Sequence, residues 1–184
     1  SYAYSWKTSD NNTNWVEIGT SSSYTLTNAE ASNFLKLEVS YIDGYGTLES
    51  LSSQYLFKIG TSEDDDLNGS SNNDKIYGNE GNDILNGGAG RDILYGNAGD
   101  DILNGGTGKD ILYGNAGDDI LNGGTGKDIL YGNAGDDILY GNTGNDSLHG
   151  GVGKDTIIGG AGNDILNGGV GKAVSYTHLR AHET

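Results

Sequence analysis

The chain has no cysteine, few basic residues and no long apolar run, and each absence excludes a class of protein. Without cysteine there is no disulfide framework and no thiolate zinc site. No apolar run approaches the roughly 20 residues that a membrane-spanning helix needs, so we expect no membrane span. Lysine and arginine number 10 against 26 acidic residues, which gives a formal net charge of −16. A chain this acidic attracts cations and repels nucleic acid, so we expect no nucleic-acid partner.

The composition changes sharply near residue 59 and divides the chain into two parts. Of the 33 glycines, 30 lie between Gly60 and Gly171. Residues 60–172 carry 19 acidic and 6 basic side chains, a balance of −13, whereas residues 1–59 have a balance of −3. The chain begins at Ser1 with neither Met nor a basic, apolar leader, so we expect a fragment of a longer protein.

Residues 60–172 repeat a unit of nine residues, shown most clearly by Gly-Gly-Thr-Gly-Lys-Asp-Ile-Leu-Tyr at 105–113. We number the places of each unit from one to nine, starting at Gly60. Place eight holds Leu or Ile, and place six holds Asp, in twelve consecutive units. The place-six residues are Asp65, Asp74, Asp83, Asp92, Asp101, Asp110, Asp119, Asp128, Asp137, Asp146, Asp155 and Asp164. A period this strict is typical of a solenoid, in which every unit repeats one piece of structure.

The unit resembles the RTX (repeats-in-toxin, hemolysin-type) calcium-binding nonapeptide, Gly-Gly-x-Gly-x-Asp-x-hydrophobic-x, over about three fifths of the chain. The resemblance implies an all-β fold in which residues 60–172 form a calcium-bound parallel β-roll. A second interpretation starts from Asn-Gly steps such as Asn104-Gly105, which are typical of β-hairpins, and from the preference of Asp for turns. A hairpin meander, however, does not require Asp at every ninth residue.

The repeat predicts which side chains face inward. We expect two units to form one coil, with the glycine-rich half of each unit turning and a triplet such as Ile111-Leu112-Tyr113 forming a short strand. Because side chains alternate across a strand, Asp110 and Leu112 should point inward, and Ile111 and Tyr113 outward. Successive coils should pair in parallel about 4.8 Å apart, so that units n and n+2 become neighbours.

This stacking predicts a ladder of carboxylates along each edge of the roll. Neighbouring charges about 5 Å apart repel each other by roughly 3 kcal/mol at an effective dielectric constant of 20. A single column of Leu and Ile buries too little apolar surface to offset this repulsion and the entropy of ordering the chain. We therefore expect the repeats to be largely disordered without cations.

Calcium is the cation that this arrangement favours. It accepts six to eight oxygens from carboxylates and carbonyls in flexible geometry, whereas magnesium needs a tighter octahedron. All twelve place-six aspartates are therefore predicted metal ligands, and pairing neighbours gives at most ten calcium sites, from Asp65/Asp83 to Asp146/Asp164. The resemblance implies that carbonyls of the glycine turns complete each shell.

The two edges of the roll are expected to differ, because residues 96–113 recur identically at 114–131 and the true period is one coil. Place five carries Asp100, Asp118 and Asp136 on one edge, but Arg91, Lys109 and Lys127 on the other. Place nine stacks Tyr77, Tyr95, Tyr113 and Tyr131, followed by His149, on one outer face. This tyrosine ladder is either cross-strand packing or a docking strip for a neighbouring domain, a sugar or a surface, with the surface ligand unknown.

Residues 1–59 show short alternating runs that predict strands at Tyr2–Trp6, Trp15–Ile18, Tyr24–Thr27, Phe34–Tyr41 and Leu48–Lys58. These runs resemble immunoglobulin-like sandwich modules, so we expect a partial Ig-like β-sandwich, truncated before Ser1. At the other end the repeat stops at Ala173, where Asp is due. Val174–Thr184 resembles one reading frame of a sequencing adapter, and we interpret residues 173–184 as not native.

No catalytic motif is present: there is no nucleophile elbow, phosphate loop or dinucleotide fingerprint. We therefore expect no enzymatic activity. The resemblance implies a calcium-binding structural module of a secreted or cell-surface bacterial protein, exported unfolded by type I secretion machinery and folding on extracellular calcium. One hypothesis is an adhesin; the alternative is the carboxyl-terminal carrier of a secreted enzyme, such as a protease or lipase, or of a pore-forming toxin.

Overall fold

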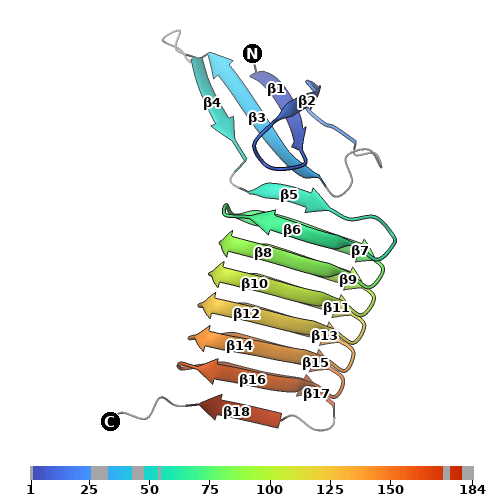
Figure 1. The fold of residues 1–184 in the computed structure, drawn as a ribbon, viewed down its shortest axis with the longest axis vertical. Coiled ribbons are helices and arrows are strands. Elements are labelled where there is room, and N and C mark those ends of the chain that lie inside the picture. Colours follow the sequence, from blue (N-terminus) through green and yellow to red (C-terminus); the bar gives the residue numbers. More distant parts are fainter. Residues whose placement is uncertain (1, 26–32, 43–47, 54, 172–174, 180–184) are drawn as a thin grey trace.

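The computed structural model describes residues 2–25, 33–42, 48–53, 55–171 and 175–179. In these residues all regular secondary structure consists of β-strands (Figure 1). No helix in these residues is long and apolar enough to cross a membrane. The strands form one eleven-stranded and one seven-stranded sheet. The all-β expectation is therefore confirmed.

The repeats form a flat roll in which two parallel sheets face each other (Figure 1). The even-numbered strands of one sheet are β6 (Asp66–Ser70), β8 (Ile84–Gly90), β10 (Ile102–Gly108), β12 (Ile120–Gly126), β14 (Ile138–Gly144), β16 (Thr156–Ala161) and β18 (Ser175–Leu179). The odd-numbered strands of the other are β7 (Asp74–Glu80), β9 (Ile93–Ala98), β11 (Ile111–Ala116), β13 (Ile129–Ala134), β15 (Ser147–Val152) and β17 (Ile165–Val170). Consecutive strands thus alternate between sheets, as a coil of two units requires.

The strand register confirms that one coil is eighteen residues. Ile111 lies opposite Ile129 and Tyr113 opposite Tyr131, each pair separated by two units. Inward side chains form a continuous apolar column between the sheets, and each of its members is fully buried: Leu67, Ile76, Leu85, Leu94, Leu103, Leu112, Leu121, Leu130, Leu139, Leu148 and Ile157. The predicted β-roll is therefore the observed fold of residues 60–171.

The strands of the roll are longer than the predicted triplets. Most have six or seven residues, and only Gly117–Asp119 separates β11 from β12. Parallel pairing continues through the glycine-rich half of the unit, as at Asn115–Asn133, so the turn itself is short. Glycine is required where the turn begins: Gly126 has a φ of 147°, and a Cβ there would overlap the carbonyl oxygen of Gly108.

The described strands before β6 extend the eleven-stranded sheet beyond the roll (Figure 1). The strands are β1 (Tyr2–Ser9), β2 (Val16–Gly19), β3 (Phe34–Ile42), β4 (Leu48–Ser52) and β5 (Leu56–Ile59). Strand β3 pairs with β1, β4 and β5, all antiparallel, and β5 then pairs in parallel with β7. The strand β5 thus joins an antiparallel sheet to the first coil of the roll.

The expected Ig-like module is not confirmed. All described strands before β6 belong to a single sheet, whereas a sandwich needs a second sheet packed on the first. Within the predicted strand Tyr24–Thr27, Tyr24 and Thr25 lie outside any strand, and residues 26 and 27 lie outside the described part. The predicted strand Leu48–Lys58 is divided into β4 and β5.

The last strand leaves the repeat register. Strand β18 pairs with β16, but Ile157 lies opposite Tyr176, nineteen residues further on rather than eighteen. The repeat frame is therefore lost between β17 and β18. Residues 173, 174 and 180–184 lie outside the described part, and the interpretation of 173–184 as an adapter translation stays a prediction.

Candidate metal sites

The place-six aspartates form two ladders, one along each edge of the roll. In each ladder the backbone N–H of one Asp donates to Oδ1 of the Asp one coil further on, as from Asp101 to Asp119 at 2.8 Å. The ten such bonds are 2.8–3.2 Å long. They join Asp65, Asp83, Asp101, Asp119, Asp137 and Asp155 on one edge, and Asp74, Asp92, Asp110, Asp128, Asp146 and Asp164 on the other. The turns that carry them stack along both edges in Figure 1.

These carboxylates are deeply buried and only half satisfied. The ten from Asp74 to Asp155 are at most 1% exposed, whereas Asp65 and Asp164 are partly exposed. In nine of them the second oxygen, Oδ2, is buried without a hydrogen-bond partner: Asp83, Asp92, Asp101, Asp110, Asp119, Asp128, Asp137, Asp146 and Asp155. A buried carboxylate oxygen without a partner is costly. The arrangement therefore calls for cations.

Backbone oxygens converge with these carboxylates at place one. A Cβ on Gly105 would lie 2.8 Å from Oδ2 of Asp110 and 2.7 Å from the carbonyl oxygen of Gly123 in the next coil. Only glycine leaves this space open. In the part of the chain that the structure describes, no three Asp, Glu, His or Cys side chains form a metal-binding group. A cation would therefore take carboxylate and carbonyl oxygens together, the donors that calcium prefers.

Burial makes the carboxyl groups weak acids in the absence of a cation. It raises the pKa of Asp92 and Asp119 to about 7. It raises the pKa of Asp101, Asp128, Asp137 and Asp146 to about 6. The hydrogen bond that each carboxylate accepts from the backbone of the previous coil lowers its pKa and so opposes these increases. The negative charges of neighbouring ladder carboxylates raise the pKa of Asp92 and Asp119 further.

We expect the calcium-free roll to become more stable as the pH falls from about 8 to about 5. A carboxyl whose pKa is higher in the folded chain binds its proton more tightly there. For Asp119 protonation therefore favours folding at pH values between 3.8 and about 7, and this advantage is lost above the higher value. Far-UV circular dichroism of the calcium-free chain at both pH values measures the change. A β-sheet signal that weakens on acidification would contradict this expectation.

The first coil differs from the later ones. Oδ2 of Asp65 accepts hydrogen bonds from the backbone and hydroxyl of Thr61, and Oδ2 of Asp74 accepts the same pair from Ser70. Sequence reasoning missed these partners. The available signal was at place two, where Thr61 and Ser70 stand and the later units have Asn or Gly.

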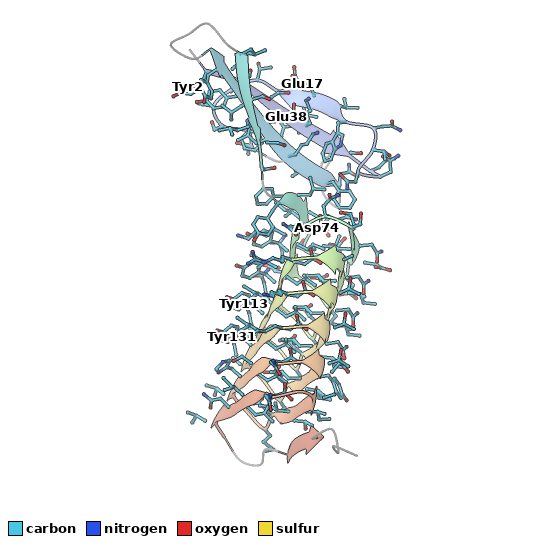
Figure 2. All side chains as sticks on the ribbon, turned by 90° about the vertical axis from the view of Figure 1, so that its left-hand side faces the viewer. Tyr2, Glu17, Glu38, Asp74, Tyr113 and Tyr131 are labelled. Atoms are coloured by element: carbon cyan, nitrogen blue, oxygen red, sulfur yellow. The ribbon has the colours of Figure 1, made fainter. Side chains whose placement is uncertain are left out.

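The outer surfaces of the roll are also regular. Tyrosine rings of neighbouring coils are parallel within 5–6° with centroids 4.9–5.0 Å apart, and His149 stacks on Tyr131 at 4.9 Å. Figure 2 shows Tyr113 and Tyr131 one above the other on the outside of the roll. Because the ring faces cover one another, this geometry supports cross-strand packing. On the other face Asn86, Asn104 and Asn122 each donate to the Asn of the previous coil.

The comparisons with known proteins concern the repeats. A family model described as the RTX calcium-binding nonapeptide repeat (4 copies) matches residues 59–94, 81–112, 95–130, 113–148 and 140–172. The overlapping matches cover residues 59–172 without a gap. A search of curated proteins finds no match.

Proposed function

The chain belongs to the RTX calcium-binding nonapeptide repeat family, and from this premise we propose that its repeats are the calcium-dependent folding module of a secreted or cell-surface bacterial protein. RTX repeats bind calcium, and the buried oxygens of both ladders fit such an ion. The single observation that carries the proposal is the set of nine buried carboxylates whose Oδ2 has no hydrogen-bond partner.

Each calcium ion would be held by aspartates of neighbouring coils and would supply the positive charge that both ladders need. An ion between Asp101 and Asp119 would bridge two coils, so binding and folding would be one equilibrium. The protein's own contribution is to orient the carboxylates: each Oδ1 is held by an N–H of the previous coil, which leaves Oδ2 available. The number of ions stays a prediction of up to ten.

The same equilibrium supports a role in secretion. Where calcium is scarce the carboxylates repel one another, so the chain would stay extended enough to pass through a type I secretion channel. Extracellular calcium would then fold it. We propose that the intact protein is an adhesin in which the roll is a stiff spacer, because the sheet of residues 2–59 continues directly into the roll.

We propose a structural rather than a catalytic role for the module. The adjacent acids Asp118 and Asp119 have the chemistry for acid–base work. Asp119, however, is 1% exposed, and Oδ1 of each accepts a backbone N–H of a neighbouring coil. Calcium titration of the whole chain, followed by circular dichroism, tests the proposed function. A chain that is already folded in chelator and indifferent to calcium would overturn it.

We expect the two edges to differ in calcium affinity because place five is mostly acidic on one edge, where Lys154 is the exception, and basic or uncharged on the other. Asp100 adds to the negative potential at Asp101 and Asp119, whereas Lys109 and Lys127 stand at place five on the other edge. Replacing Asp100 and Asp118 with Asn should raise the calcium midpoint of folding by roughly twofold to tenfold, and replacing Lys109 and Lys127 with Asn should lower it.

Asn is the matched replacement because Asn73, Asn82, Asn145 and Asn163 already stand at place five. The measurement is the calcium midpoint of the circular dichroism signal at low and at high ionic strength. Both shifts should shrink in high salt, since exposed charges are screened. If both double variants shift the calcium midpoint in the same direction, the predicted difference in calcium affinity between the two edges is wrong.

A further inference from the structure

In the first coil of the roll, protein groups donate hydrogen bonds to Oδ2 of the place-six Asp, an atom that has no partner in the later coils. Thr61 N and Oγ1 lie 2.6 and 2.9 Å from Oδ2 of Asp65. Ser70 N and Oγ lie 2.7 and 2.9 Å from Oδ2 of Asp74. In the nine later aspartates from Asp83 to Asp155 the same oxygen has no hydrogen-bond partner.

The backbone at place two explains the difference. Asn97, Asn115 and their equivalents have φ values between 68° and 89°, in the left-handed region. Thr61 and Ser70 are not among the positive-φ residues of the described chain. A β-branched residue such as Thr strongly disfavours that region. The backbone N–H at place two is therefore free to donate to the carboxylate, and the hydroxyl adds a second bond.

A buried cation completes this coil. Lys58 in β5 lies opposite Ile76, at the end of the apolar column, and is 9% exposed. Its Nζ donates to the carbonyl oxygen of Asn68 at 2.9 Å and lies 4.8 Å from the centre of the Phe34 ring. Burial lowers the pKa of Lys58, whereas Asp66 and Asp74 oppose this change. The amino group of Lys58 thus interacts electrostatically with Asp74, whose Oδ1 has no hydrogen-bond partner.

We infer that Lys58, Thr61 and Ser70 take the place of calcium in the first coil and determine where calcium binding begins. This inference rests on the proposed function. Of the ten neighbouring aspartate pairs, the two that contain Asp65 and Asp74 then hold no calcium, which leaves eight. The coil of residues 60–80, whose strand β7 pairs with β5, is a calcium-independent cap. Its exposed strand edges are the template on which the calcium-dependent coils assemble.

Hydrogen exchange of the whole chain in a calcium chelator tests the cap. We expect the amides of β5 and β7 to be protected by at least about tenfold over those of β9 to β15. A variant with Lys58→Met, Thr61→Gly and Ser70→Gly should lose this protection, because Gly, one of the two residues of later units at place two, removes both hydroxyls and accepts the left-handed φ of those units. Asn97→Gly, which places Gly at place two in the middle of the roll, should leave it unchanged.

Counting bound calcium by native mass spectrometry gives a second readout on the folded, calcium-saturated chain. The Thr61→Gly, Ser70→Gly variant should bind one or two more ions than the parent chain, and Asn97→Gly should bind the same number. Equal counts, together with no excess protection of β5 and β7 in chelator, would overturn the inference while calcium-dependent folding stands. Uniform protection of the whole roll in chelator would overturn the inference and the proposed function together.

Discussion

Removal of calcium is expected to abolish most of the β-sheet signal of the chain in far-UV circular dichroism, and calcium is expected to restore it cooperatively. The buried carboxylates of each ladder lie one coil apart, where neighbouring charges repel by roughly 3 kcal/mol at an effective dielectric constant of 20. The opposing apolar column is only one side chain wide, from Leu67 to Ile157. In residues 81–171, Oδ2 of the nine aspartates from Asp83 to Asp155 has no hydrogen-bond partner.

The titration is best followed at constant ionic strength, with magnesium as the control. Magnesium has the same charge but demands a tight octahedron of ligands, so it should fail to restore the signal at concentrations where calcium succeeds. The antiparallel strands β1–β4 carry only two aspartate or glutamate residues among those described with their side chains, Glu17 and Glu38, and should contribute a calcium-independent background. Equal restoration by both ions would mean that charge screening rather than coordination folds the roll.

Replacement of Asp119 by Asn should raise the calcium midpoint of folding by at least about tenfold, since even changes outside the first ligand shell cost that much in metal sites. Asn keeps the Oδ1 that accepts the N–H of Asp101 but replaces the unpaired Oδ2 with an amide group. It thereby removes one negative ligand from two predicted sites, those shared with Asp101 and with Asp137. Because each ion would be held by aspartates of two coils, the loss should propagate through the cooperative transition.

The preceding residue provides the matched control. Asp118 is exposed at place five, and its Oδ1 accepts the N–H of Asp136 at 2.6 Å, which Asn can also do. Asp118→Asn removes the same charge and should shift the midpoint by only about twofold, as for an exposed, solvent-screened charge. Both variants are compared by calcium titration monitored with circular dichroism. If the two midpoints shift equally, place six has no special role as a ligand.

The repeat period allowed most of the roll to be predicted because each unit meets the same environment. Asp110 and Leu112 point inward, and Tyr113 stacks between Tyr95 and Tyr131, as the alternation of side chains along a strand requires. Strand length was underestimated because a glycine-rich segment has the composition of a turn. Its backbone nevertheless pairs with the same segment of the next coil, as at Asn115 and Asn133.

Residues 1–59 were less predictable because short alternating runs indicate strands but not their partners. The positions of β1, β2 and β3 agree with the runs that begin at Tyr2, Trp15 and Phe34 to within a few residues. The sandwich expected from them depended on a second sheet, whereas β5 instead pairs with β7 and makes one sheet with the roll. Pairing between distant strands is decided by tertiary packing and leaves little trace in local sequence.

Twelve aspartates and twelve apolar residues at a nine-residue period specify a parallel roll, two carboxylate ladders and a need for cations, because period and side-chain alternation act within each unit. Which carboxylates have partners depends on the folded chain. The hydrogen bonds of Thr61 and Ser70 follow from the local φ at place two, and the charge of Lys58 reaches Asp74 only because β5 lies beside β7. The interaction between Lys58 and Asp74 joins two strands that the repeat does not relate, and a nine-residue pattern carries no information about it.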